Sequence, residues 1–174
     1  MTKLIMLCGL PGTGKSHTVD KMDLDPDSTF VYSTDRHIEE MAKIDGKTYS
    51  DVFKTYIKDA EASMDVGLVD ALLKRKIILW DRTCLTPKTR RKVLNRIPSD
   101  YITYAWAVVP PRNMMEEYEW EDRLKQREVL GKIIPPNVMA TMRKSYSLPT
   151  TDEGFDVVSY ADIYGNHIET HVSD

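Results

Sequence analysis

Cysteine, excess charge and long apolar runs are all scarce in this chain of 174 residues. With only two cysteines, Cys8 and Cys84, the sequence has neither a disulfide framework nor a cysteine-based zinc site. A formal charge of −3 disfavours a protein that coats long nucleic acids, which usually needs a basic surface. Every apolar run is far shorter than the ~18 residues of a membrane span, and "KLIMLCGL" is too short for a signal peptide. We therefore expect a cytoplasmic protein whose two thiols are buried.

The order of apolar runs and helical patterns predicts an α/β fold in one domain, residues 1–174. Five short apolar segments suit buried parallel strands, at 3–9, 29–33, 76–81, 101–109 and 155–160. Helices are expected at 15–22, from about Asp35 with Ser33 or Thr34 as its cap, at 49–76 with Gly67 as a potential break, at 86–97, at 111–130 and at 135–146. The residues from about 160 to 174 are expected to form a C-terminal tail.

The segment "GLPGTGKS" follows the first apolar run and matches the phosphate-binding pattern G-x-x-x-x-G-K-[ST]. Its glycines allow successive backbone N–H groups to point toward phosphate oxygens. Lys15 would reach the β- and γ-phosphates, and the Ser16 hydroxyl would ligate Mg²⁺. The pattern therefore predicts a nucleoside triphosphate site whose loop residues are Gly9, Pro11, Gly12, Thr13, Gly14, Lys15, Ser16 and His17.

A kinase needs, besides a phosphate loop, a carboxylate near the acceptor hydroxyl. Asp35 follows the second expected strand, at the sheet edge where doubly wound folds bind ligands, although a carboxylate at that place also suits a helix N-terminus. Asp81 ends the third expected strand. We consider it a second candidate, for a water-mediated metal contact or for orienting the acceptor.

A kinase also needs cations around the phosphoryl group in transfer. Arg123 and Arg127 lie one helical turn apart, ahead of a loop that contains Gly131. The segment from about 120 to 136 looks like a lid over the nucleotide. The alternative is an ordinary solvated helix face in which these arginines pair with Glu119 or Glu128.

Taken in order, these motifs resemble the P-loop kinases of the polynucleotide 5′-hydroxyl kinase type, in particular the kinase domain of phage end-healing enzymes. The similar segments run from about residue 3 to 159 and are "GLPGTGKS", "VYSTD", "WDRTCLTPKTR", "RLKQREVLGKIIPPNVMATM" and "PTTDEGFDVV". The resemblance implies a P-loop kinase fold, with a central five-stranded parallel sheet, helices on both faces and a helical lid. A phage-encoded member would act in the host cytoplasm.

The resemblance also implies roles for individual residues. Lys15 and Ser16 would hold the triphosphate and Mg²⁺, with ATP as the phosphate donor. Asp35 would be the general base that takes the proton from the acceptor hydroxyl. Arg127 would contact the transferring phosphate, and Arg123 would contact the donor nucleotide.

Three features depart from this pattern. Family members often carry an arginine three residues after the base to grip the acceptor's phosphate, and this chain has Ile38 there. Arg36 points about 100° away around a helix and is no simple replacement, whereas Arg82 is a candidate for the missing contact. Cys84 stands where asparagine is common, and no phosphatase segment of the Asp-x-Asp-x-Thr type follows. The candidate acceptor-binding residues are Arg36, Asp81, Arg82 and Thr83.

The predicted function is an ATP-dependent polynucleotide 5′-hydroxyl kinase, which transfers the γ-phosphate to the 5′-OH end of DNA or RNA. A second interpretation keeps the chemistry but changes the acceptor to a nucleoside, a small metabolite or a hydroxymethylated base in DNA. Ile38 and the acidic charge favour it. A third, non-enzymatic interpretation is an ATP-gated binding or switch module, against which the acceptor-side carboxylate and the lid argue. No membrane partner is expected, and the sequence leaves the oligomeric state open.

Three charged segments have simpler interpretations beside functional ones. The basic runs at 74–76 and 88–92 are either solvated helix ends or a track for a polynucleotide backbone that leads to Asp35. The acidic segment at 115–122 would repel nucleic acid and should lie away from such a track. "HIETH", at 167–171, lacks the Glu directly after the first His of a zinc-protease motif, so we expect an ordinary tail there.

Overall fold

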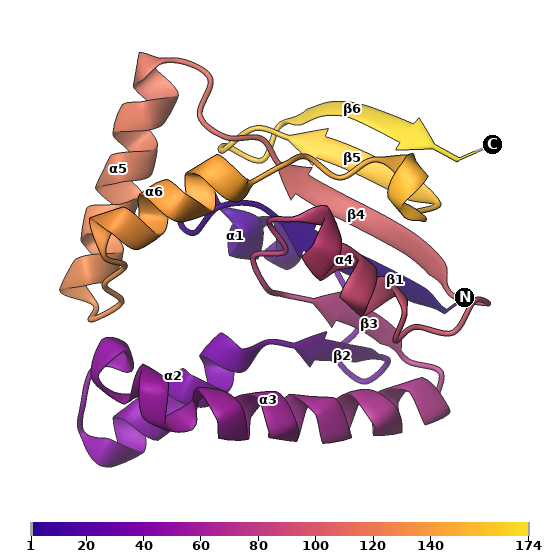
Figure 1. The fold of residues 1–174 in the computed structure, drawn as a ribbon. Helices are drawn as coiled ribbons and strands as arrows, with labels where there is room; N and C mark the ends of the chain where they lie inside the picture. The colour runs from indigo at the N-terminus through magenta and orange to yellow at the C-terminus, as the bar shows by residue number, and fades with distance from the viewer. Residues whose placement is uncertain (1, 174) are drawn as a thin grey trace.

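The structure is a computed structural model and describes residues 2–173. Its strands form one sheet in the order β2-β3-β1-β4-β5-β6 (Figure 1). They are β1 (Lys3–Cys8), β2 (Thr29–Tyr32), β3 (Ile77–Trp80), β4 (Ile102–Val108), β5 (Val157–Ala161) and β6 (His167–Val172). The first five pair in parallel, which confirms the predicted α/β class and its five-stranded parallel sheet. The sixth strand, β6, pairs antiparallel with β5 and extends the sheet beyond the prediction.

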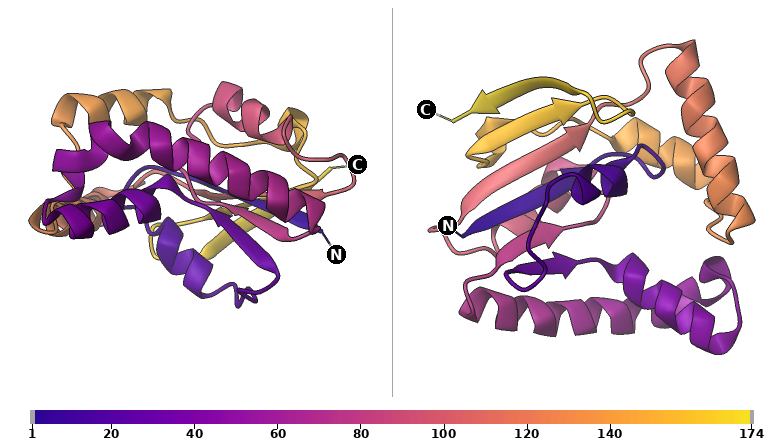
Figure 2. Two further views of the ribbon diagram at one scale, coloured as in Figure 1. Left: turned by 90° about the horizontal axis from the view of Figure 1, so that it is seen from below. Right: turned by 180° about the vertical axis from the view of Figure 1, so that it is seen from behind.

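The helices are α1 (Lys15–Asp20), α2 (Thr34–Asp45), α3 (Tyr49–Leu73), α4 (Pro87–Leu94), α5 (Met114–Val129) and α6 (Pro136–Ser145), with a short 3-10 turn, η1 (Thr151–Glu153). They cover the two faces of the sheet unequally: α3, α4 and α6 lie on one face and α1 on the other (Figure 2). None of the helices formed by residues 2–173 combines the length and the apolar character that crossing a membrane requires.

The alternation of side chains along β1 builds both layers of the core. Leu4, Met6 and Cys8 point into the larger cluster, together with residues of α3 and α4. Ile5 and Leu7 point the other way, into the cluster beneath α1. Because every side chain of β1 from Leu4 onward is buried, the strand reads as a continuous apolar run, as expected for the centre of a parallel sheet. Both thiols are buried, as predicted.

Local signals in the sequence explain where the helices begin. Thr48 and Asp51 bond each other's backbone in a capping box at the start of α3, and Thr86 caps α4 ahead of a proline in the first turn. Ser33 takes the N-cap position of α2, as expected, although its side chain makes no capping bond. The helix α3 continues through Gly67, where a break was considered. A side chain there would meet the ring of Phe30 at 2.7 Å, so this glycine permits close packing of α3 on β2.

The segment expected to be a tail contains the end of β5 and the whole of β6. The turn between the two strands is held by Asp162, which accepts hydrogen bonds from the backbone N–H groups of Tyr164 and Asn166, and by Gly165 at φ +82°. All six residues of β6 are exposed, so the strand carries no apolar pattern to reveal it. The turn-forming sequence before β6 is the signal from which this strand could have been predicted.

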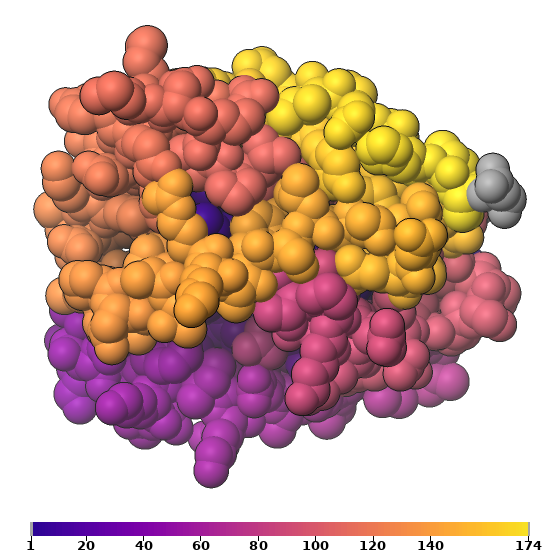
Figure 3. All heavy atoms as spheres, turned by 45° about the horizontal axis from the view of Figure 1, so that its top comes forward, coloured from indigo at the N-terminus to yellow at the C-terminus, as the bar shows by residue number. Residues whose placement is uncertain are grey.

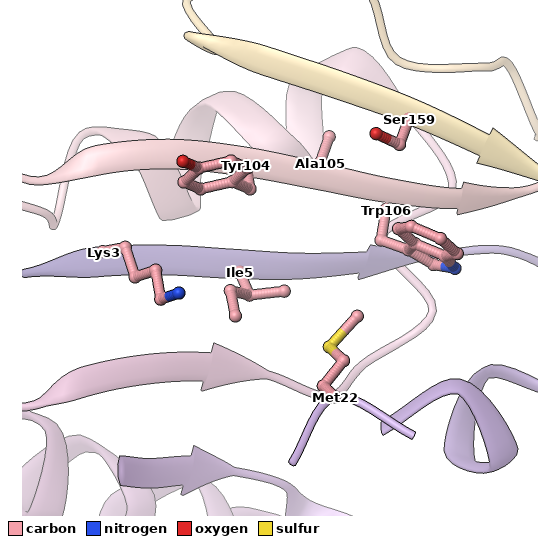
Figure 4. A pocket seen from close by; sticks show the side chains of 7 residues that line it. All are labelled: Lys3, Ile5, Met22, Tyr104, Ala105, Trp106 and Ser159. Carbon is pink, nitrogen blue, oxygen red and sulfur yellow. The ribbon is translucent and has the colours of Figure 1, made fainter. Parts of the chain in front are cut away.

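The face of the sheet that carries α1 is only partly covered. A hollow of about 100 Å³ opens there among side chains of β1, β4 and β5, with Met22 at its rim (Figure 4). The indole N–H of Trp106, which lines it, is buried and bonds no acceptor within residues 2–173. This hollow lies on the sheet face, away from the strand ends that bear the predicted site residues.

Candidate functional site: a phosphate loop between a lid and a helical hairpin

The predicted phosphate loop connects β1 to α1 at the carboxyl edge of the sheet. Gly9, Gly12 and Gly14 all have positive φ angles, of 152°, 77° and 95°. Gly14 is also the N-cap of α1, in the left-handed conformation that favours glycine. A backbone N–H of the loop fixes its position, because Gly9 donates to the carbonyl of Thr83 on the neighbouring segment, at 3.1 Å. This geometry is suited to presenting successive N–H groups to an anion.

Lys15 is the one buried cation of the loop. Its ammonium donates to the carbonyl oxygens of Gly9 and Leu10, at 2.8 and 2.7 Å. Burial lowers the pKa of Lys15 to about 8, and the negative charge of Asp81 acts in the opposite direction. An anion bound by the loop would favour the charged form of this lysine, so the site is electrostatically prepared for phosphate.

The side chains of Pro11 and Thr13 are buried within the loop. The hydroxyl of Thr13 donates to the carbonyl of Leu10 at 2.8 Å and is buried. The carbonyl of Pro11 accepts a 2.8 Å hydrogen bond from the indole of Trp120 on α5. Of the predicted nucleotide-binding residues, Pro11 and Thr13 therefore contribute backbone geometry, whereas Ser16 and His17 are exposed at the start of α1.

A pocket of about 400 Å³ adjoins the loop and is lined by Gly14, His17, Arg123, Ile163 and Tyr164. Arg123 donates to Glu119 at 2.9 Å and to the carbonyl of Ile163 at 2.7 Å, and its guanidinium lies 5.9 Å from the centre of the Tyr164 ring. The pocket therefore contains the predicted residues Arg123 and His17 beside two residues that were not predicted. Ile163 and Tyr164 lie in the β5–β6 turn, within the segment expected to be a tail.

Asp35 lies in the first turn of α2, just beyond β2. The hydroxyl of Tyr49, the first residue of α3, donates to its Oδ1 atom at 2.7 Å. The neighbouring strand β3 ends next to Asp81, whose backbone N–H donates to the carbonyl of Tyr32 at 3.0 Å. The two carboxylates therefore lie at adjacent strand ends, as the sequence predicts. Tyr49 was not predicted, because no local pattern connects it to position 35.

The pKa of Asp81 depends on its burial and on the charges of Lys15 and Asp35. Burial raises the pKa of Asp81, Lys15 opposes that rise, and the negative charge of Asp35 adds to it. The Asp81 carboxyl group, at the end of β3, is therefore influenced by charges from both the loop and the end of β2. The predicted donor and acceptor sides of the site therefore meet at this strand end.

Arg127 and Arg123 occupy one helix but have different surroundings. Arg123 forms an ion pair with Glu119, one of the two pairings expected for an ordinary solvated helix face. Arg127 forms no ion pair within residues 2–173, and its buried Nε atom has no hydrogen-bond acceptor there. Its positive charge lowers the pKa of both Lys15 and Tyr49, so it lies near the loop and near the partner of Asp35.

The segment expected to be a lid packs on the helical hairpin formed by α2 and α3. Figure 3 shows the α5–α6 segment resting on this hairpin. The carbonyl of Gly131 accepts hydrogen bonds from the backbone N–H and the hydroxyl of Ser50, at 3.1 and 2.9 Å. The N–H of Ile133 donates to the same hydroxyl at 2.9 Å. Lys132 forms an ion pair with Glu39.

The candidate acceptor residues lie in different environments. Ile38, at the position of the absent arginine, is fully buried in the hairpin core. Arg36 is exposed and Arg82 donates to Glu61 on α3 at 3.1 Å, so both lie at the surface near Asp81. Thr83 contributes its carbonyl to Gly9, as described above.

Cys84 has a φ of +44°, which is unusual for a residue other than glycine, asparagine or aspartate. Asparagine adopts this backbone conformation more readily than cysteine does.

The two basic runs do not form a continuous track to Asp35. Lys74 and Arg75 pair with Asp70 and Asp100 at the amino end of β3, the opposite edge of the sheet from Asp81. In the second run, the fully buried Arg90 pairs with Glu153 at 2.7 Å and donates to the carbonyl of Cys84 at 3.0 Å. Arg90 therefore stabilises the fold, and only its exposed neighbours are available to a ligand.

The site fits Mg²⁺ bound together with a triphosphate. Within residues 2–173 no three His, Cys, Asp or Glu side chains cluster to hold a metal by themselves. Mg²⁺ at such sites keeps water and phosphate oxygens and takes only one or two protein ligands. The exposed Ser16 hydroxyl is available as a ligand, and a cation would offset the repulsion between the carboxylates of Asp81 and Asp35.

Comparison with known families supports the same fold. A family model described as an AAA domain (AAA_33) matches residues 4–149. The chain belongs to this family. The match contains the predicted phosphate loop, Asp35, Asp81 and the segment expected to be a lid, and it ends before the β5–β6 turn. The protein therefore has the kinase-like P-loop fold that its first motif indicates.

Solved structures resemble the whole chain at low sequence identity. One comes from the PezAT chromosomal toxin-antitoxin system of Streptococcus pneumoniae, with a TM-score of 0.64 and 17% identity over 98% of this chain and 71% of that one. A putative kinase from Chloroflexus aurantiacus has a TM-score of 0.60 and 17% identity over 92% and 85%. A chain of the Pnkp1/Rnl/Hen1 RNA repair complex has a TM-score of 0.60 and 19% identity over 99% of this chain, which spans half of that chain's length. At these identities the likeness establishes the fold.

Proposed function

We propose that the protein is an ATP-dependent kinase that transfers the γ-phosphate of ATP to the 5′-hydroxyl end of DNA or RNA. The observation that carries this proposal is the arrangement around Lys15. Asp35, Asp81 and the phosphate loop follow the three neighbouring strands β2, β3 and β1 at one edge of the sheet. The charges of Lys15 and Asp35 both act on Asp81 there, and Arg127 acts on Lys15. A module that only senses ATP would not need the additional carboxylate Asp35, which is held by the hydroxyl of Tyr49.

Each residue has a defined part in the proposed transfer. The loop and Lys15 hold the triphosphate, and the pocket beside Arg123 takes the donor nucleoside. Asp35 accepts the proton of the acceptor hydroxyl while the hydroxyl oxygen forms a bond to the γ-phosphorus. The bond between the γ-phosphorus and the β-γ bridging oxygen breaks at the same time, and ADP is released. Arg127 stabilises the negative charge on the transferring group.

Mg²⁺ would be held by the Ser16 hydroxyl and, through water, by Asp81, and it would neutralise charge on the bound triphosphate. Residues 1–174 would act as one kinase domain, with residues 120–136 as its lid. We propose the cytoplasm as its location, which is the host cytoplasm if the protein is phage-encoded.

The choice of a polynucleotide acceptor is supported by two observations. One similar structure belongs to an RNA repair complex. In addition, Arg36 and Arg82 provide cationic groups near Asp81, where the phosphate next to a terminal 5′-hydroxyl would lie. Thr83 and Asp81 complete the candidate acceptor side.

A smaller acceptor is the second candidate, and Ile38 is the observation that favours it. Because this side chain is fully buried between α2 and α3, position 38 offers no contact to an acceptor phosphate. A nucleoside, a small metabolite or a hydroxymethylated base in DNA would not require that contact.

The experiment that tests the proposal offers γ-labelled ATP and Mg²⁺ to the protein with a set of acceptors in parallel. These are 5′-hydroxyl DNA and RNA oligonucleotides, the same oligonucleotides with a 5′-phosphate, nucleosides, and duplex DNA with hydroxymethylated bases. We expect label on the 5′-hydroxyl oligonucleotides and none on their phosphorylated controls. Label on small molecules or modified bases alone would establish the second candidate, and ATP binding without any labelled product would indicate a switch module.

A further inference from the structure

Tyr49 links the proposed base to the lid through direct contacts. Its hydroxyl donates to Oδ1 of Asp35 at 2.7 Å, and its ring lies 5.1 Å beneath the ammonium of Lys132. Within residues 2–173, no protein donor bonds the other carboxylate oxygen of Asp35. The tyrosine therefore occupies one oxygen and leaves the other for an acceptor hydroxyl.

The same turn of α3 receives the lid. Ser50 binds the carbonyl of Gly131 with both its N–H and its hydroxyl, and that hydroxyl also accepts from Ile133. Gly131, at φ +80°, lies so close to Thr48 that an added side chain would approach its Cβ atom to 2.7 Å. Residues 131–133 thus dock on residues 48–50, and glycine at position 131 permits the close approach to Thr48.

Tyr49 remains a hydrogen-bond donor across the working range of pH. Burial, and then the neighbouring Asp35, raise the pKa of its hydroxyl, while Arg127 acts against that rise. The influence of Arg127 also shows that the lid arginine and the tyrosine are close together. Docking of residues 131–133 therefore brings the lid cation toward the same carboxylate that Tyr49 holds.

We propose that Tyr49 is a positioning residue that orients Asp35 toward the acceptor when residues 131–133 dock on Ser50. Lid docking and base orientation then form a single event, so that the base is aligned when the cationic lid covers the transferring phosphate. This inference rests on the proposed kinase function and concerns how its acceptor side is assembled.

The test compares two tyrosines of one helix. Tyr49→Phe removes the hydroxyl but keeps the ring beneath Lys132. Tyr56→Phe is the matched control, because the Tyr56 hydroxyl bridges α3 to Asp45 of α2 at 3.0 Å but does not contact Asp35. We expect Tyr49→Phe to lower kcat for transfer about tenfold to a hundredfold with the KM for ATP unchanged, and Tyr56→Phe to leave both within about twofold.

A second variant tests the link to the lid. Ser50→Ala removes the hydroxyl that holds residues 131 and 133, so we expect faster backbone hydrogen exchange at residues 131–133 and a lower kcat. If docking and orientation are one event, the double variant with Tyr49→Phe should be no slower than the slower single variant. Effects that multiply would overturn the coupling.

The outcomes separate this inference from the proposed function. Transfer by Tyr49→Phe at the wild-type rate, or an equal loss in Tyr56→Phe, would overturn the role of Tyr49 and leave the kinase assignment in place. Absence of transfer by the wild-type protein to every acceptor would overturn the proposed function and the role of Tyr49 with it.

Discussion

The donor side and the acceptor side of the candidate site are built in different ways. The donor side depends on a short continuous segment, whose three glycines have positive φ and whose lysine bonds carbonyls five and six residues away. The acceptor side is assembled from segments far apart in the chain. Asp35 meets Tyr49 across a helical hairpin, and the hairpin is held by residues 131–133.

This difference separates what fixes the chemistry from what selects the acceptor. The loop's glycines and Lys15 suit any nucleoside triphosphate, so its geometry predicts a donor site but no particular acceptor. The acceptor side depends on long-range packing, which turns Ile38 inward and leaves Arg36 and Arg82 at the surface. Changes on the two sides should therefore affect different kinetic constants.

The largest effect is expected at the proposed base. Asp35→Asn keeps the shape of the side chain but removes its capacity to take a proton, so turnover should fall about a hundredfold to ten-thousandfold while ATP binding is nearly unchanged. Steady-state transfer and calorimetric ATP binding measure the two effects. Asp45→Asn, an exposed carboxylate of the same helix, is the control. Wild-type turnover in Asp35→Asn would contradict the assignment of the base.

Next in size is the loss of the buried ion pair between Arg90 and Glu153, in which Arg90 also binds the carbonyl oxygens of Cys84 and Ser147. Arg90→Met leaves Glu153 and two carbonyl oxygens without their donor, so the free energy of unfolding should fall by about 3 kcal/mol. Denaturant titration measures this loss. The neighbouring exposed Arg91→Met should change it by less than about 0.5 kcal/mol. Equal stability of the two variants would show that the buried Arg90–Glu153 pair contributes no net stability.

A smaller effect, confined to the donor side, is expected at the phosphate loop. Gly12→Ala introduces a side chain at φ +77°, with Leu124 of the lid helix at 3.0 Å, so ATP should bind about tenfold more weakly. Gly46→Ala has a similar φ of +64° but nothing within 4 Å. It should cost about 1 kcal/mol of stability and leave the affinity for ATP unchanged. Equal ATP affinities in the two variants would show that Gly12 does not contribute to ATP binding.

The smallest effect is the contribution of Lys15 to the pH dependence of stability. Its pKa is about 8 in the folded protein and 10.5 as the ordinary value, so between these pH values the unfolded chain holds a proton that the folded protein lacks. Rising pH therefore favours the folded state. Without ATP, the stability of the wild type relative to Lys15→Met should increase from pH 8 to pH 10, as urea titrations would measure. A flat difference would mean that Lys15 is not buried as a cation.

Most of the fold was predictable because its signals are local. The apolar runs gave five parallel strands, and caps such as Thr86 fixed the beginnings of helices. The sixth strand was missed because its residues are all exposed and carry no apolar alternation. Ile163 and Tyr164, which line the pocket beside Arg123, lie in the turn before this strand and were not predicted for the same reason.

By itself, the sequence determined the phosphate loop, the order of the strands along the chain and the identity of two carboxylates at strand ends. These follow from residue spacing, because a parallel sheet brings the ends of its strands to one edge. Only the tertiary structure decided that Tyr49 bonds Asp35, that Arg90 is buried while Arg127 stays unpaired, and that Ile38 faces the hairpin core. Those contacts join residues far apart in sequence, and packing rather than any local pattern selects them.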